Sequence, residues 1–365
     1  MTTPDTSTKS IPVAAGERGW RKLILALVAF VIVPELPHLR AILPIEQTIY
    51  LLLPALAACF LVGWWAGGRA LLAIGWVGLA AWMMWERPGT PDAFHNLERG
   101  WSLLLAGAFG LTCLFGERRP LFARALGALS IAVFLAIAMS MMGPVPVSAA
   151  KETIAGEFVH RNDETMGGIN GFIGDHPKEW NDLTSRFPKL ATTPAETEKQ
   201  LRTLSRIGLT VFPSLLALES LIALALAWAI YHRLSRARLG APLRPLREFR
   251  FNDQLVWGLM VGLTIVLLPT LQAFRGVGRN LLVFFYALYA VRGLGVLAWF
   301  LAPSALAATV GVGLVMLFFP FIVFQVAAVV GFLILLFASF ALGLGDTWAD
   351  WRRRVRPNSS RPTPS

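Results

Sequence analysis

Two charged residues interrupt apolar stretches of the chain in which a charge is costly. Glu219 lies in PSLLALESLIALALAW, and Arg292 lies in LYAVRGLGVLAW. A lone charge at the centre of a bilayer costs about 2.5–3.5 kcal/mol, so such residues usually face the protein interior and pair. One hypothesis is that Glu219 and Arg292 face each other in a polar substrate-binding cavity, to which Gln325 also contributes. The alternative is a structural ion pair that fixes helix register, or an arginine whose head reaches the membrane interface.

Other polar groups stand between the apolar stretches. Arg275 and Arg279, among the glycines of PTLQAFRGVGRN, could contact an anion or a lipid headgroup. The alternative is a hinge loop with solvated arginines. Glu35 and His38, in VPELPHLR, could titrate near the outer face. The two prolines there mark a helix end, which favours ordinary solvated side chains over a proton relay.

The residue patterns of catalysis and metal binding are missing from the sequence. Cys59 and Cys113 have no His or Asp at metal-ligand spacing. We find no GxxxxGK[ST], HExxH or GxSxG motif, and no pairing of a nucleophile with a base. The sequence therefore predicts a protein that is not an enzyme and has no cofactor or metal.

The elements that must position these residues are membrane helices. Hydrophobic residues make up 55% of the chain and charged residues 15%, against about 25% charged in soluble domains. Residues 304–343 contain no charged side chain, although about 20 residues suffice to cross a bilayer. Because Pro320 lies near the middle of this stretch, two helices joined by a turn at Phe319 and Pro320 fit it better than one. The predicted spans are 22–34, 48–67, 70–85, 100–116, 121–142, 205–231, 254–272, 280–300, 304–318 and 321–343.

The orientation follows from the arginine-rich loops. Arginines cluster in 18–22, 118–124, 233–250 and 352–356. With ten spans, all four clusters fall on the cytoplasmic side, as the positive-inside rule requires. We therefore expect a multi-pass protein of the bacterial inner (cytoplasmic) membrane with both termini in the cytoplasm. The net charge of +11 is explained by this topology, so the expected partner is the lipid bilayer and not nucleic acid.

The chain divides into five parts by composition. Residues 1–17 are a polar, disordered tail, 18–142 hold about five spans, 143–203 are polar, 204–344 form a second bundle, and 345–365 are a basic tail. The 143–203 segment is placed outside the membrane, as a cap over the bundle or a lid over a substrate cavity. Its glycine-rich middle, ETMGGINGFIGDHPKEW, is expected to be a loop or a short interfacial helix. Pro194 and its neighbours resemble a helix start.

Glycines also recur at a spacing of four, at Gly63 and Gly67 and at Gly258 and Gly262. Small residues at this spacing let two helix backbones approach closely. The pattern favours packing inside the protein over a dimer face.

The region from Leu204 onward resembles the YybS-like family (domain of unknown function 2232) of multi-spanning bacterial membrane proteins. The similarity lies in PSLLALESLIALALAWAIYHRL, PLREFRFNDQLVWGLMVGL, NLLVFFYALYAVRGLGVLAWFL and LGLGDTWADWRRR, in that order. The family generally has a glutamine where Arg292 stands. It has been grouped with the substrate-binding S components of energy-coupling-factor importers, which are helical bundles driven by separate ATPases. The resemblance thus implies an all-α, polytopic transmembrane bundle.

Two functions fit these observations. The first is a transport-related substrate-binding module without its own ATPase, for a small apolar or amphipathic solute. The second is a structural or assembly subunit of a membrane protein complex, with partner subunits and no small ligand. The few polar groups within the last spans suit an apolar or amphipathic ligand, or none.

Overall fold

The computed structural model describes residues 19–85, 93–116, 119–142, 147–187, 192–235, 237–301, 308, 311–312 and 322–349. Within these ranges every regular element is a helix. Four described helical segments are long and apolar enough to cross a membrane: Leu121–Met142, Thr193–Leu234, Pro269–Phe300 and Val330–Ala349. Shorter apolar helices cover Ile49–Trp65, Ala70–Trp85 and Asp253–Leu267. The chain forms two compact units.

Unit 1 contains residues 1–41, 45–198 and 219–243. Its helices are α1 (Trp20–Ile32), η2 (Val33–Glu35), α2 (Pro37–Arg40), α3 (Ile49–Trp65), α4 (Ala70–Trp85), α5 (Ala93–Phe115), α6 (Leu121–Met142), α7 (Val147–Asp175) and α8 (Pro177–Arg186), with residues 193–198 and 219–234 of α9 (Thr193–Leu234). The α4 and α6 helices have the bounds predicted from hydropathy, while α5 and α9 begin before the predicted spans.

The α3 helix forms the centre of unit 1. It packs against α4 and α5, and Leu51, Ala55 and Cys59 are fully buried. A helix that is apolar on all sides is expected to be buried in this way. The α4 helix instead exposes Leu71 and Trp85 almost fully. Such large apolar side chains suit contact with lipid tails.

The loop after α9 is fixed to the bundle through its backbone carbonyls. Tyr231 Oη donates to Ala237 O at 2.7 Å, and Arg124 Nη1 donates to Leu239 O at 2.7 Å. Trp228 Nε1 donates to Ala241 O at 3.1 Å. These bonds satisfy alternate carbonyls of a loop without regular structure. They hold part of the arginine-rich 233–250 segment in one conformation.

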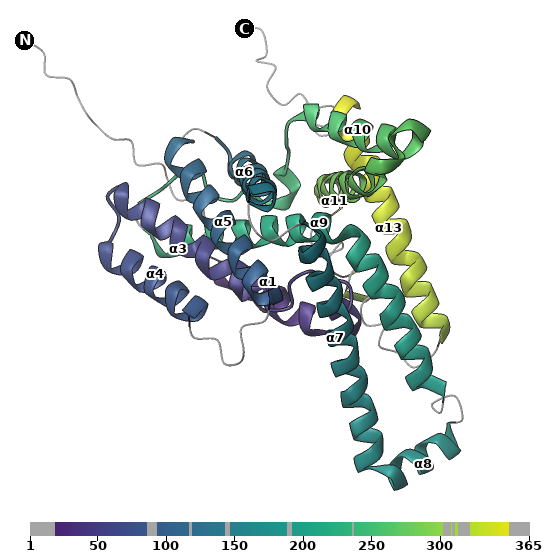
Figure 1. The fold of residues 1–365 in the computed structure, drawn as a ribbon. Coiled ribbons are helices and arrows are strands. Elements are labelled where there is room, and N and C mark those ends of the chain that lie inside the picture. Colours follow the sequence, from purple (N-terminus) through teal and green to yellow (C-terminus); the bar gives the residue numbers. More distant parts are fainter. Residues whose placement is uncertain are drawn as a thin grey trace, which may run out of the picture. The chain divides into compact units, whose positions relative to one another are not determined.

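The expectation of a loop or short helix in the middle of 143–203 is wrong. The α7 helix runs without a break from Val147 to Asp175, through all four glycines of this stretch. A glycine costs a helix only about 1 kcal/mol relative to alanine, and the surrounding Glu, Met, Ile and Asn residues continue the helical turn. Figure 1 shows α8 at the end of α7 that is remote from α5. The polar segment is thus helical in most of its described residues.

Unit 2 contains residues 42–44, 199–218 and 244–365. Its helices are η4 (Leu246–Glu248), η5 (Asp253–Leu255), α10 (Val256–Leu267), η6 (Pro269–Phe274), α11 (Arg275–Phe300) and α13 (Ile322–Ala349), with residues 199–218 of α9. The α11 helix packs against both α10 and α13. The span predicted for 304–318, the turn at Phe319 and Pro320, and the tails 1–17 and 350–365 lie wholly or mostly outside the described residues.

The predicted role of the spaced glycines in internal packing is confirmed at three positions. A Cβ atom added at Gly258 would meet the Phe285 ring, one at Gly262 would meet Leu281 and the carbonyl oxygen of Gly278, and one at Gly63 would meet Tyr231. Gly67 serves a different purpose, because its φ of +91° ends α3 in the left-handed region that favours glycine.

The α9 helix is interrupted at Pro213, and an asparagine of α11 fills the interruption. Val211 has non-helical angles, φ −109° and ψ 16°. The Asn280 side chain donates to Thr210 O at 3.0 Å and accepts from Ser214 N at 3.0 Å. These two atoms would bond each other in a regular helix, so Asn280 replaces a broken backbone bond with two bonds of its own.

Candidate functional site

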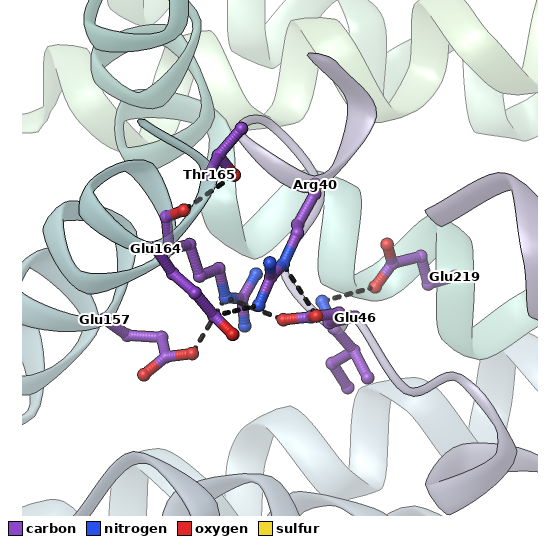
Figure 2. Close-up of polar contacts among 8 residues, drawn as sticks. Arg40, Glu46, Glu157, Glu164, Thr165 and Glu219 are labelled. Atoms are coloured by element: carbon purple, nitrogen blue, oxygen red, sulfur yellow. Dashed lines mark hydrogen bonds and ion pairs between the residues drawn. The ribbon is translucent and has the colours of Figure 1, made fainter. Parts of the chain in front are cut away.

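Glu219 is the most deeply buried acidic side chain of unit 1, with 5% of its surface exposed. Its Oε2 atom accepts a hydrogen bond from the backbone N–H of Ile45 at 3.2 Å, as Figure 2 shows. Its Oε1 atom is buried and has no hydrogen-bond partner among the described residues. A buried carboxyl normally collects several donors. Glu219 therefore has unused bonding capacity.

Five charged side chains of unit 1 form a network of ion pairs that we call the Arg40–Arg161 cluster: Arg40, Glu46, Glu157, Arg161 and Glu164. Of these, Arg161 acts electrostatically on Glu219. Arg40 Nε lies 2.6 Å from Glu46 Oε1, and Arg40 Nη2 lies 2.6 Å from Glu164 Oε2. Arg161 Nε lies 2.8 Å from Glu157 Oε1 and 3.5 Å from Glu46 Oε2. Glu46 thus bridges the two arginines, and Figure 2 shows its contact with Arg40.

Arg161 is held in place by aromatic rings as well as by carboxylates. Only 2% of its surface is exposed, and its guanidinium lies 5.2 Å from the centre of the Phe94 ring and 5.6 Å from that of Phe158. A desolvated cation over an aromatic face gains about 2 kcal/mol. The arginine is therefore fixed in position beside Glu219.

The α5 helix adds polar groups to this region. Glu98 and Ser102 are buried and lie four residues apart, on one face of the helix. Trp101 Nε1 donates to Ser220 Oγ at 3.0 Å, next to Glu219 in the sequence. Ser102 Oγ has no hydrogen-bond partner among the described residues. Ser102 and Glu219, each with an oxygen that lacks a partner among the described residues, are thus the sequence neighbours of the bonded Trp101 and Ser220.

Two groups at the edge of the Arg40–Arg161 cluster have altered acidity. The pKa of Glu35 is raised by partial burial, and then by the charge and a hydrogen bond of Glu46. For Arg40, burial opposes the charged form, but the carboxylates of Glu164 and Glu46 more than offset it, so its pKa is raised. Arg40 therefore stays charged, and Glu35 takes up a proton more readily than an ordinary glutamate.

We expect Glu35→Gln to stabilise the protein at neutral pH and to have no effect in acid. A carboxyl with a raised pKa in the folded state contributes stability below its ordinary pKa of 4.5, and this contribution is lost as the pH rises through the raised value. Glutamine mimics the protonated form, so the difference in thermal midpoint should shrink as the pH falls. Glu152→Gln, at an exposed position of α7, is the control. A Glu35→Gln variant that is less stable than wild type at neutral pH would contradict this assignment.

Arg292 lies in unit 2 in a separate ionic group. Arg292 Nε bonds Asp346 Oδ2 at 3.0 Å, and Arg292 Nη1 bonds Asp253 Oδ1 at 2.6 Å. Its guanidinium also lies 5.3 Å from the centre of the Phe251 ring. Glu219 and Arg292 fall in different units, and each has partners of its own. Their pairing stays a prediction.

The remaining predicted site residues have separate positions. Arg275 and Arg279 are exposed and lie in the first two turns of α11, so the loop expected around them is wrong. Gln325 lies on α13, and its side chain is outside the described part of the structure. Cys59 and Cys113 are buried free thiols. The described residues contain no group of three or more His, Cys, Asp or Glu side chains that could hold a metal ion.

The Arg292 group brings three stretches of the resemblance together. Asp253 belongs to FRFNDQLVW, Arg292 to YAVRGLGVLAW and Asp346 to LGLGDTWADW. The profile of a family described as "Predicted membrane protein (DUF2232)" matches residues 169–336. These residues form a DUF2232 region. The resemblance to the YybS-like family is thereby confirmed, and with the apolar helices it identifies a membrane protein. No curated protein and no solved structure matches the chain.

The DUF2232 region supplies only some of the residues around Glu219 and only some of those in the Arg292 group. It contains Glu219, Asp253 and Arg292, whereas Arg40 and Arg161 precede it. Sequence reasoning missed both arginines as site residues. They lie in polar stretches where charges are ordinary, so the only available signal was an excess of glutamates near them. The N-terminal residues therefore complete the polar surroundings of a glutamate in the DUF2232 region.

Proposed function

We propose that this chain is a transport-related substrate-binding module of the bacterial inner membrane, without an ATPase of its own. The observation that carries the proposal is Glu219, whose buried Oε1 atom has no partner among the described residues. An unsatisfied buried oxygen costs about 1–3 kcal/mol. Such a cost is typical of a site whose partner is a ligand.

The solute that fits this site is small and amphipathic. The helix faces beside Glu219 are mainly apolar, and its few polar groups come from α5, α7 and the segment before α3. A ligand site with such surroundings would fix orientation with a few polar contacts and gain affinity from apolar burial. The grouping of the YybS-like family with S components of energy-coupling-factor importers would agree with a module that is driven by a separate subunit.

The proposed topology has ten spans, with both termini in the cytoplasm. It places the arginine loop that Arg124, Trp228 and Tyr231 hold on the cytoplasmic side, where a partner subunit would dock. The 143–203 segment would then lie outside. The four arginine clusters of the sequence support this arrangement.

We expect a small molecule to co-purify with the protein in mild detergent, and Glu219→Gln to reduce its retention at least tenfold. The amide keeps the size of the side chain but loses the acid. Mass spectrometry of the extracted ligand measures the effect, and Glu152→Gln is the matched control, because Glu152 is an exposed glutamate of α7 outside the Arg40–Arg161 cluster. Equal retention by all three proteins would remove Glu219 from the site.

A structural or assembly role is the second candidate, and a specific observation favours it. In the Arg292 group, both aspartates bond the guanidinium, and an arginine engaged by two carboxylates of its own unit fits a structural role. Recovery of a stoichiometric set of partner subunits without any small molecule would decide for this function.

A further inference from the structure

The helices α5 and α9 run side by side and in the same direction at the level of Glu219. Trp101 Nε1 donates to Ser220 Oγ at 3.0 Å, and the Phe109 and Trp228 rings make an edge contact with 6.3 Å between their centres. In both pairs the two residues are 119 positions apart in the sequence. This equal spacing fixes the register, so each residue of unit 1 on α9 lies level with the α5 residue 119 positions before it.

The register places three buried polar side chains on one side of the seam between α5 and α9. Glu219 lies midway between the levels of Glu98 and Ser102, about 3 Å from each along the axis. Successive residues of a helix are about 100° apart. In parallel helices, one step forward from the contact residue Trp101 and one step back from its partner Ser220 therefore turn to the same side. These steps lead to Ser102 and Glu219, and Glu98 shares the helix face of Ser102.

Two oxygen atoms of this group have unused bonding capacity. Glu219 is 5% exposed and Ser102 is 1% exposed. Neither Glu219 Oε1 nor Ser102 Oγ has a hydrogen-bond partner among the described residues. Figure 2 shows a dashed line to the Ile45 nitrogen from one oxygen of Glu219 and none from the other. Because both unused atoms can accept a hydrogen bond, one donor between the two helices could satisfy them together.

The positive charge that Glu219 requires is not supplied by the Arg40–Arg161 cluster. The charges that act on Glu219 are Arg161 and Glu98, which have opposite signs. Arg161 is engaged by Glu157 at 2.8 Å and by Glu46 at 3.5 Å, and the whole cluster has three carboxylates for two guanidinium groups. A buried carboxylate needs a cation close to it. The donor that fits this place therefore carries a positive charge.

We propose that Glu219 and Ser102 bind the ammonium group of a primary amine, with Glu98 adding negative charge to the site. The inference rests on the proposed function and names the class of its solute, an amphipathic amine. An ammonium group has three donors and no acceptor, so it can donate to Glu219 Oε1 and Ser102 Oγ at once. A neutral hydroxyl would leave the charge of Glu219 uncompensated. One turn further along, Leu105 and Ala223 are buried and apolar, which suits the hydrocarbon part of such a solute.

Equilibrium binding of radiolabelled octylamine to the full chain in mild detergent tests the proposal. Wild type should bind the amine saturably. Glu219→Gln should weaken binding at least tenfold, because it removes the charge, and Ser102→Ala severalfold, because it removes one acceptor. The control Glu152→Gln, at an exposed position of α7, should bind as wild type does. Unlabelled 1-octanol, which has the same chain length and a neutral head, should displace the label at least tenfold less well than unlabelled octylamine.

Octanol that displaces the label as well as octylamine does overturns the proposal, and so does undiminished binding by Glu219→Gln or the lack of saturable binding by wild type. If Glu219→Gln does not fold, Ser102→Ala decides, and an affinity equal to that of wild type overturns the proposal. Solute retention by wild type is measured separately. A protein that retains a neutral solute loses only the amine site. One that binds octylamine through Glu219 but retains no solute loses only the transport-related function.

Discussion

Replacing Gly293 by alanine should destabilise unit 2 more than the same replacement at any other described glycine of this unit. A Cβ atom on Gly293 would overlap the carbonyl oxygen of Ser339, and one on Gly343 would overlap the carbonyl oxygen of Tyr289. Both neighbours are backbone atoms, so no side-chain rotation relieves the overlap. The helices α11 and α13 would have to separate, at a cost of about 1–3 kcal/mol or more.

Gly276→Ala is the control for this prediction, because it lies on the same helix and its added Cβ would meet no atom within 4 Å. Alanine there should leave stability unchanged or raise it slightly, since glycine is the poorer helix former by about 1 kcal/mol. The thermal midpoint in detergent, followed by tryptophan fluorescence, gives both values. A larger side chain at position 293, such as valine, should lower the midpoint further. Equal midpoints for Gly293→Ala and Gly276→Ala would show that the close approach of α11 and α13 is not needed for stability.

The helices of this protein could be predicted from sequence because lipid imposes one simple requirement. A span must be apolar over about 20 residues and satisfy its own backbone. The bounds of α4 and α6 follow directly from this requirement. The bounds of the α7 helix could not be predicted in this way, because its polar, glycine-containing sequence has no apolar signal. Its helical form is supported by contacts such as those of Arg161 with Phe94 and Glu46.

Of the residues around Glu219, only Glu219 itself could be predicted from the sequence. A glutamate in the middle of an apolar span is conspicuous, so Glu219 could be found. The partners of a buried charge were not predictable, because they come from polar stretches far away in the chain. Glu46 and Arg161 are an example, and Asp346 is another, since it looks like an ordinary solvated residue at a span end but is fully buried beside Arg292.

Arg292→Gln should lower the free energy of unfolding by about 3–5 kcal/mol, because it removes the arginine that pairs with the buried Asp346 carboxylate. The side chain of Asp346 is 0% exposed, whereas that of Asp253 is 58% exposed. Loss of the exposed partner in Asp253→Asn should therefore cost less than about 1 kcal/mol. Comparing Arg292→Gln with Asp253→Asn therefore separates the buried partner of Arg292 from its exposed partner.

A double substitution separates the ion pair from simple loss of packing. In Arg292→Gln with Asp346→Asn, no uncompensated charge remains, and the two amides can bond each other. Most of the stability should return, with an interaction energy at the upper end of the usual range of about 0.5–3 kcal/mol. The double variant therefore tests whether Arg292 and Asp346 depend on each other. Additive losses from the two substitutions would instead mean that Arg292 acts through its contact with Phe251 rather than through Asp346.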